Sequence, residues 1–270
     1  MLYEYILKNY DKAAFMTAAK LGVSVGVSES TVVRFAIELG FSGYPKLQKS
    51  LQELIKNKLT TVQRLELSSD YITEGHALKG VLKADMENIR STMEKIDYNT
   101  FEDVVNNIFA AKRIYIIGLR SSMALAEFLG FYLNIILQNV KTVGYGISDI
   151  FEQMINVGEG DLVIGIGFPR YASRTIDALA FAQDRGATVV AVTDSFLSPL
   201  AARADYSLIA QSNMASFVDS LVAPLSVINA LIIAVGMREK ENISSTFNSL
   251  EEIWREYNVY SYNNRNVGDD

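Results

Sequence analysis

The chain has 270 residues, of which 49% are apolar and 21% charged, so it is long enough for two globular domains and too apolar to be disordered. It holds no cysteine and one histidine, His76, which excludes thiolate nucleophiles, Cys/His zinc sites and histidine-based catalysis, so we expect no metal and no cofactor. The net charge of −6 is uneven, because residues 1–58 hold eight Lys and Arg against five Asp and Glu, whereas residues 59–270 hold seventeen against twenty-six.

The basic head, residues 1–58, is predicted to be all-helical. An apolar pattern at helical spacing opens the chain over residues 1–10, and a second helix should cover residues 17–25. Ser28 is the expected cap of a third helix that ends at Gly40, and a fourth helix begins near Pro45. The short gap between the second and third helices predicts a helix-turn-helix, whose second helix enters the DNA major groove.

Polar residues at the start of that third helix are the candidate DNA contacts. Hydroxyl and guanidinium groups bond phosphate oxygens and base edges, and Arg34 can bond a guanine in bidentate fashion. The alternative is a helical bundle that only mediates dimerisation. The candidate DNA-binding residues are Ser28, Glu29, Ser30, Thr31 and Arg34.

The acidic body is predicted to be an α/β domain. Residues 59–80, which include His76, lose periodicity and are interpreted as a linker; the body covers residues 81–260, and a flexible tail covers residues 261–270. Helices are expected at 81–96 and 101–111. The strands that follow are expected at residues 113–117, 142–143, 162–166, 188–192 and 206–209. Their alternation with helices predicts a parallel sheet flanked by helices on both faces.

One segment of the body, residues 217–236, is almost wholly apolar and is expected to be a helix that is buried or forms an oligomer interface. Asp219 and Pro224 interrupt it, and no signal peptide opens the chain, so we expect no membrane span and a cytoplasmic protein. We expect a homodimer or homotetramer, since a two-fold regulator reads paired half-sites. Segment 217–236 is the expected contact, with the helices in 81–111 as a second one.

Two loops that follow strand ends are the candidate ligand site, because open parallel sheets bind ligands there. Each loop is rich in small polar residues and opens a helix, whose N–H groups and dipole favour an anion. Ser121 as a simple helix cap is an equal alternative, and Arg174 is a further partner for phosphate. The candidate ligand contacts are Gly118, Arg120, Ser121, Ser122, Arg170, Tyr171, Ser173 and Thr175.

Three stretches of the head, residues 15–19, 26–35 and 39–44, resemble the N-terminal domain of the RpiR family of transcriptional regulators. In that family a sugar isomerase (SIS) domain follows, and the body of this chain is similar to one. The resemblance implies a double-stranded DNA operator as a partner and a phosphorylated sugar, or a related small anion, as the effector. It also implies that the chief effector contacts are Ser121, Ser122, Ser173 and Thr175.

The sequence departs from that family in two places. The second loop usually reads Ser-x-Ser-Gly-x-Thr, whereas Gly167 and Pro169 stand here in place of the serines. Either this variant loop binds an anion through Arg170 and Tyr171, or the ligand is a different one. Family members also usually carry one more helix before the segment that opens this chain.

The competing function is a sugar-phosphate isomerase. Isomerisation needs a base near the substrate carbon, and without a histidine in the pocket the candidates are Glu127, Asp149 and Glu152. Carboxylates on a helix surface are usually solvated or paired, so we expect the protein not to be an enzyme.

Overall fold

The computed structural model describes residues 1–55, 60–68, 77–214 and 217–261. His76 and most of the expected tail lie outside these residues. The chain forms two compact units, which do not follow the order of the sequence. The first unit contains residues 1–90, 168–171 and 212–221, and the second contains residues 91–167, 172–211 and 222–270.

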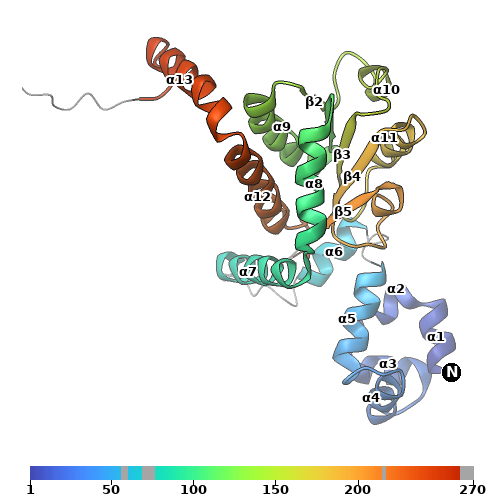
Figure 1. Ribbon diagram of the computed structural model, residues 1–270. Helices are drawn as coiled ribbons and strands as arrows, with labels where there is room; N and C mark the ends of the chain where they lie inside the picture. Colours follow the sequence, from blue (N-terminus) through green and yellow to red (C-terminus); the bar gives the residue numbers. More distant parts are fainter. Residues whose placement is uncertain (56–59, 69–76, 215–216, 262–270) are drawn as a thin grey trace, which may run out of the picture. The chain divides into compact units, whose positions relative to one another are not determined.

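The first unit opens with five helices (Figure 1): α1 (Leu2–Lys8), α2 (Tyr10–Ala13), α3 (Ala18–Val25), α4 (Glu29–Glu38) and α5 (Tyr44–Ile55). The helix predicted over residues 1–10 is present as α1, but it ends at Lys8 and a second short helix, α2, begins at Tyr10. Asn9 leaves the helical conformation at φ −133°, and its side-chain amide donates to the Tyr5 carbonyl at 3.1 Å, so α1 ends there. The other three predicted helices of the head are confirmed, and Thr17 caps α3 through its hydroxyl.

Helices α3 and α4 form the predicted helix-turn-helix. Gly26 ends α3 with φ at 77°, a left-handed conformation that glycine adopts without strain. Gly22 lets α3 approach the chain that leads into α4, since a Cβ at this position would lie 2.7 Å from the Val27 carbonyl oxygen. The close packing of the two helices therefore depends on the missing side chain of Gly22.

Tyr44 fastens α5 to the segment that precedes α3. Its hydroxyl donates to the carbonyl oxygen of Met16 at 2.8 Å, and the Ala13 carbonyl lies 3.3 Å away. Burial of the phenol raises the pKa of Tyr44 to about 12. The head thus has its own core, in which Leu21 and Val32 are completely buried.

Helix α6 (Thr61–Ser68) lies within the range expected to be a linker. Arg64 is completely buried, and its Nη1 lies 2.9 Å from Oδ1 of Asp219. At the start of the helix, the Thr61 hydroxyl accepts a hydrogen bond of 2.9 Å from Nη1 of Arg170. These two contacts hold α6 against segments 168–171 and 212–221 of the same unit.

Helix α7 (Ala77–Lys95) begins four residues before its expected start at residue 81. The Asn88 side chain donates to the Asn213 carbonyl at 2.9 Å and accepts from the Asn213 N–H at 3.1 Å. The Ser220 hydroxyl donates to Asp85 at 2.6 Å. Polar side chains of α7 thus hold the segment 212–221.

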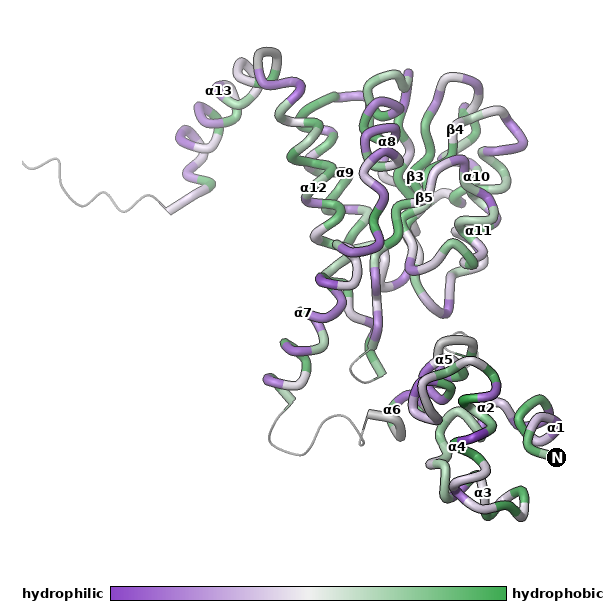
Figure 2. The backbone as a smooth tube through the Cα atoms, turned by 60° about the horizontal axis from the view of Figure 1, so that its bottom comes forward, coloured by the Kyte–Doolittle hydropathy of each residue, from purple (hydrophilic) through white to green (hydrophobic). Residues whose placement is uncertain are grey.

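The second unit is built on a parallel sheet of order β2-β1-β3-β4-β5, which confirms the predicted fold class. Its strands are β1 (Ile114–Ile117), β2 (Val140–Val143), β3 (Leu162–Ile166), β4 (Thr188–Thr193) and β5 (Tyr206–Ile209). Strands β1 and β3 are buried along their whole length, as expected for a parallel sheet covered on both faces. The continuous apolar strands are visible in Figure 2.

Helices cover both faces of this sheet (Figure 1). On one face α8 (Tyr98–Ala110), α9 (Met123–Leu137) and α12 (Val222–Arg238) pack together, and α10 (Ile150–Gln153) and α11 (Ser173–Gln183) lie on the other. The remaining elements are the short helices η1 (Arg120–Ser122) and η2 (Ala201–Arg203) and α13 (Lys240–Glu256), which the sequence analysis did not predict.

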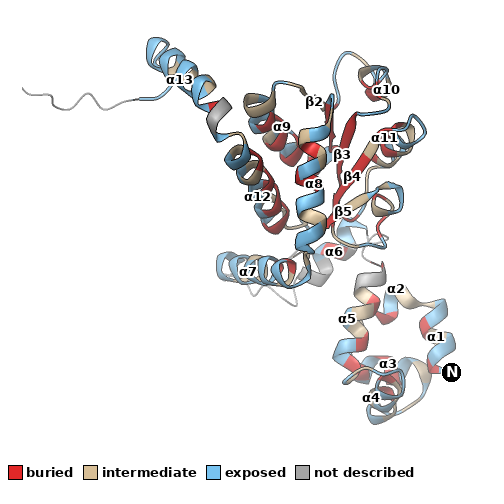
Figure 3. Ribbon diagram, viewed as in Figure 1, coloured by how far each residue is buried: buried red, intermediate tan, exposed pale blue. Residues whose placement is uncertain are grey.

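The apolar segment 217–236 is helical only from Val222 onward, so its predicted start is wrong. Pro224 lies in the first turn, where its missing N–H removes no helical hydrogen bond, and Asp219 precedes the helix. One face of α12 is buried in the core of the second unit (Figure 3), and Val222, Ile233 and Met237 are exposed. Among the described residues, no single helix has both the length and the apolar character needed to cross a bilayer.

Candidate functional site

The sheet of the second unit has a topological switch point between β1 and β3. These strands are neighbours, with Ile117 paired with Gly165, yet the chain leaves β1 for α9 on one face and β3 for α11 on the other. Open α/β sheets bind ligands at the carboxyl ends of strands at such a point. The structure therefore brings the first predicted loop and the start of α11 to adjacent strand ends.

The loop after β1 is a tight turn, and none of its hydroxyl groups caps the helix that follows. A Cβ on Gly118 would lie 2.6 Å from the carbonyl oxygen of Ser122, so only glycine fits. Arg120 is left-handed with φ at 58° and is followed by helical residues, a combination whose N–H groups form an anion-binding concavity. Ser121 is exposed, and no side chain caps η1 or α9, so the alternative that Ser121 is a helix cap is wrong.

The start of α11 has the same character. No side chain caps this helix, and Ser173, its first residue, is exposed. Thr175 is 1% exposed, and its hydroxyl oxygen has no hydrogen-bond partner among the described residues. An unpaired buried hydroxyl costs about 1–3 kcal/mol, so this side chain is held at an energetic penalty beside the switch point.

Packing explains why Gly167 replaces the serine expected in the second loop. A Cβ on Gly167 would lie 2.7 Å from Cδ2 of Leu200, which is completely buried. A serine at this position would therefore displace a core side chain. The sequence alone gave no sign of this contact, because Leu200 is distant along the chain.

Arg170 and Tyr171 belong to the first unit, whereas the four candidate hydroxyl residues belong to the second. Arg170 has φ at 63° and donates to Thr61. Arg174 forms an ion pair with Asp149, and its guanidinium carbon lies 5.0 Å from the centre of the Phe151 ring. The arginine expected to be free for phosphate on α11 is thus already engaged.

Two of the three candidate bases of the competing isomerase have structural contacts. Asp149 caps α10 by accepting from the Phe151 N–H at 3.0 Å, and Glu152 accepts from the Asp149 N–H at 3.0 Å, which completes a capping box. Glu127 is exposed on α9. Across residues 1–55, 60–68, 77–214 and 217–261, no cluster of three or more acidic or histidine side chains is suited to a metal.

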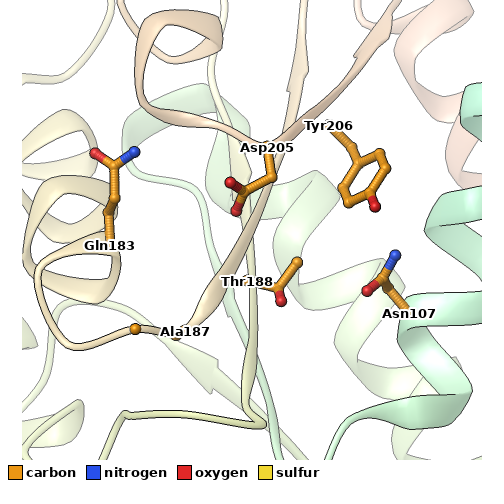
Figure 4. A pocket seen from close by; sticks show the side chains of 7 residues that line it. Asn107, Gln183, Ala187, Thr188, Asp205 and Tyr206 are labelled. Carbon is orange, nitrogen blue, oxygen red and sulfur yellow. The ribbon is translucent and has the colours of Figure 1, made fainter.

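A polar hollow of about 390 Å³ lies elsewhere in the second unit (Figure 4). Thr188 and Tyr206, the first residues of β4 and β5, line it, so it lies at the amino edge of the sheet and not at the switch point. The carboxylate of Asp205 at this hollow accepts from the Val189 N–H at 2.8 Å. The remaining lining residues are Asn107, Gln183, Gly186 and Ala187.

In the head, the start of α4 presents the residues predicted to contact DNA. The Ser28 hydroxyl caps α4 by accepting from the Thr31 N–H at 3.2 Å and lies 2.8 Å from the hydroxyls of Ser30 and Thr31. Glu29 and Arg34 are exposed. Arg34 has no ion pair or hydrogen bond with any other described side chain.

A helix-turn-helix head joined to a parallel α/β domain with a polar switch point defines a DNA-binding regulator of the effector-responsive class. The sequence comparisons agree: residues 1–58 match the helix-turn-helix domain of the rpiR family, and residues 107–234 match the SIS domain. The chain belongs to the RpiR family of transcriptional regulators. An uncharacterised helix-turn-helix regulator of Haemophilus influenzae is 28% identical over 89% of this chain and 85% of its own length.

Solved structures are also similar to this chain. The sugar isomerase domain of an RpiR transcription factor from Sphaerobacter thermophilus is 30% identical and aligns with a TM-score of 0.63 over 66% of this chain and 99% of its own. The Vibrio vulnificus NanR protein, solved in complex with ManNAc-6P, is 20% identical and aligns with a TM-score of 0.58 over 97% of this chain and 93% of its own. At 20% identity, the similarity to NanR shows a shared fold and does not by itself extend to the ligand.

Proposed function

We propose that this transcriptional regulator binds a phosphorylated sugar, or a related small anion, at the carboxyl ends of β1 and β3. The observation that carries the proposal is the pair of uncapped helix starts beside the switch point, with exposed Ser121 and Ser173 and the unpartnered Thr175 hydroxyl. Helix starts and free hydroxyls are the groups that bind phosphate. The complex of NanR with ManNAc-6P supports the same class of ligand.

In this proposal the effector regulates DNA binding. It does so by favouring one of two states that differ in operator affinity, since a ligand with equal affinity for both states shifts nothing. The regulator acts as a homodimer or homotetramer in the cytoplasm and has no isomerase activity. The capping contacts of Asp149 and Glu152 support this last point, because a carboxylate that caps a helix is not free to act as a base.

The DNA contacts are proposed to lie at the start of α4. We expect Arg34→Ala to weaken operator binding by about 1–3 kcal/mol, roughly five- to 150-fold, because an exposed guanidinium at a base edge contributes that much. The measurement is fluorescence anisotropy of the full chain across a salt series, with a duplex selected by the parent protein from random sequences.

The matched control is Lys8→Ala, which removes one exposed positive charge from α1. We expect it to change affinity only slightly. Equal affinity of Arg34→Ala and the parent protein at every salt concentration would show that α4 does not read DNA through Arg34.

The effector site is tested by Ser121→Ala and Ser173→Ala, both at exposed positions where folding should be unaffected. A thermal-shift screen of phosphorylated sugars and sugar acids supplies the ligand, since a ligand at 100 times its dissociation constant stabilises the fold by ~2.7 kcal/mol. Each variant is then titrated with it. We expect each lost hydroxyl to weaken binding by about 1 kcal/mol, roughly fivefold.

Asn107→Ala, in the hollow at the amino edge, is the control and should bind the ligand as the parent does. The proposal fails if both serine variants bind with parental affinity. Weakened binding by Asn107→Ala alone would place the effector in the hollow of Figure 4.

A further inference from the structure

The two buried side chains of helix α7 are polar, whereas its large apolar side chains are exposed. Asn88 and Thr92 are almost completely buried. Both are hydrogen-bonded: Asn88 to the backbone of Asn213, and the Thr92 hydroxyl to the N–H of Gln211 at 2.8 Å. The hydrogen-bonded side of α7 is therefore polar, the reverse of a helix that packs on a hydrophobic core.

The large apolar side chains of α7 form a stripe on another side of the helix, and Figure 3 shows α7 as largely exposed. The stripe contains no charged residue and extends about 22 Å along the helix at 1.5 Å per residue. Its members are between 40% and 76% exposed: Leu78, Leu82, Met86, Ile89 and Met93. Isolated exposed apolar residues are normal, but a continuous stripe marks an interaction surface.

The spacing of the stripe indicates what covers it. From Leu82 to Met86, Ile89 and Met93 the steps are four, three and four residues, the repeat of a helix that packs against a second helix in a coiled-coil seam. A second copy of this chain offers the same stripe, and a two-fold interface is self-complementary by construction. We propose that two copies of the protein associate through α7.

The two segments 69–76 and 262–270 hold fewer large apolar side chains than the stripe. Residues 69–76, which precede α7, include two large apolar side chains, Tyr71 and Ile72. Residues 262–270 likewise include two, Tyr262 and Val267. To cover the five exposed apolar side chains of the stripe, a partner must offer a comparable number of apolar side chains, and a second copy of α7 does so.

The size of the stripe predicts the dissociation constant of the association. Five side chains from each copy are few beside the ~20–30 residues a side of a stable interface, so we expect association in the micromolar range that is sensitive to each side chain. The inference rests on the homo-oligomer in the proposed function and names its surface. It assigns that surface to α7 in preference to α12, where Val222, Ile233 and Met237 are exposed but six residues of the helix are buried in the core.

The test compares the two apolar surfaces in the full chain. The double variant Met86→Glu/Met93→Glu places charges in the seam, and Ile233→Glu/Met237→Glu is the matched control on α12. All four positions are exposed and glutamate favours helix, so circular dichroism should show parental helicity for both. Sedimentation equilibrium from 0.5 to 50 µM, chosen to span the expected range, then measures association.

We expect the α7 variant to associate at least ~100-fold more weakly, or to form an assembly with half as many copies, and the α12 variant to match the parent. An assembly lost only in the α12 variant would overturn the assignment to α7 and leave the homo-oligomer intact. A parent protein that is monomeric at 50 µM would overturn both the assignment to α7 and the proposed homo-oligomer. The Arg34→Ala measurement tests DNA binding independently of either result.

Discussion

Arg64→Met is expected to lower the free energy of unfolding of the first unit by about 3 kcal/mol, because it removes one partner of a buried ion pair. The Arg64 guanidinium is completely buried, and its partner Asp219 is largely so. The substitution leaves the Asp219 carboxylate without its ion-pair partner in a poorly solvated place. Urea unfolding followed by circular dichroism measures the loss, and hydrogen exchange of the α6 amides localises it.

Two further variants test whether a loss of stability in Arg64→Met comes from the broken ion pair. Arg203→Met removes an exposed arginine at the end of η2 and should change stability by less than about 0.5 kcal/mol. The double variant Arg64→Met/Asp219→Leu removes both charges and should recover most of the stability, since a buried pair can be replaced by apolar residues at little cost. If Arg64→Met unfolds at the parental urea concentration with α6 equally protected, the pair does not anchor this helix.

Gly118→Ala is expected to weaken effector binding by at least ~tenfold, which corresponds to 1.4 kcal/mol. A Cβ at this position would lie 2.6 Å from a backbone carbonyl oxygen, and backbone cannot move aside as a flexible side chain can. The loop that carries Ser121 and Ser122 would have to shift. Isothermal titration with the ligand found by thermal shift measures the effect.

Gly146→Ala is the matched control, because this glycine lies in the loop after β2 and an added Cβ would meet no atom within 4 Å. It should bind the effector as the parent does. We expect Gly118→Ala also to destabilise the second unit by roughly 1–3 kcal/mol, as overpacking does. Parental affinity in Gly118→Ala would show that the shape of this loop does not matter for the effector.

The sequence by itself determined the elements whose signals are local. Strand β3 and helices α3 and α4 lie within a residue or two of their predicted bounds. Their signals are an apolar period and a Ser or Gly residue at a helix end, and these depend only on a few neighbouring residues. The α/β class followed from the alternation of strands and helices. The switch point could also be anticipated, because polar loops after buried strands converge at one edge of a parallel sheet.

The effector loops show what a single sequence can and cannot predict about a site. The candidate hydroxyl residues Ser121, Ser122, Ser173 and Thr175 were found from their position after strands. The left-handed conformation of Arg120 was not, since arginine carries no signal for a positive φ. Nor was the missing capping of α9 and α11, which depends on where the serine side chains point.

Only the tertiary structure decided which distant residues meet. Arg64 lies in the range expected to be a linker, and its ion-pair partner Asp219 is 155 positions later in the chain. Gly167 looked like a lost ligand contact, and its small size is required by Leu200. In α7 the fold buries the polar side chains of Asn88 and Thr92, whose backbone partners lie 125 and 119 positions later in the chain. Each of these outcomes comes from long-range packing, which a local pattern of residues does not encode.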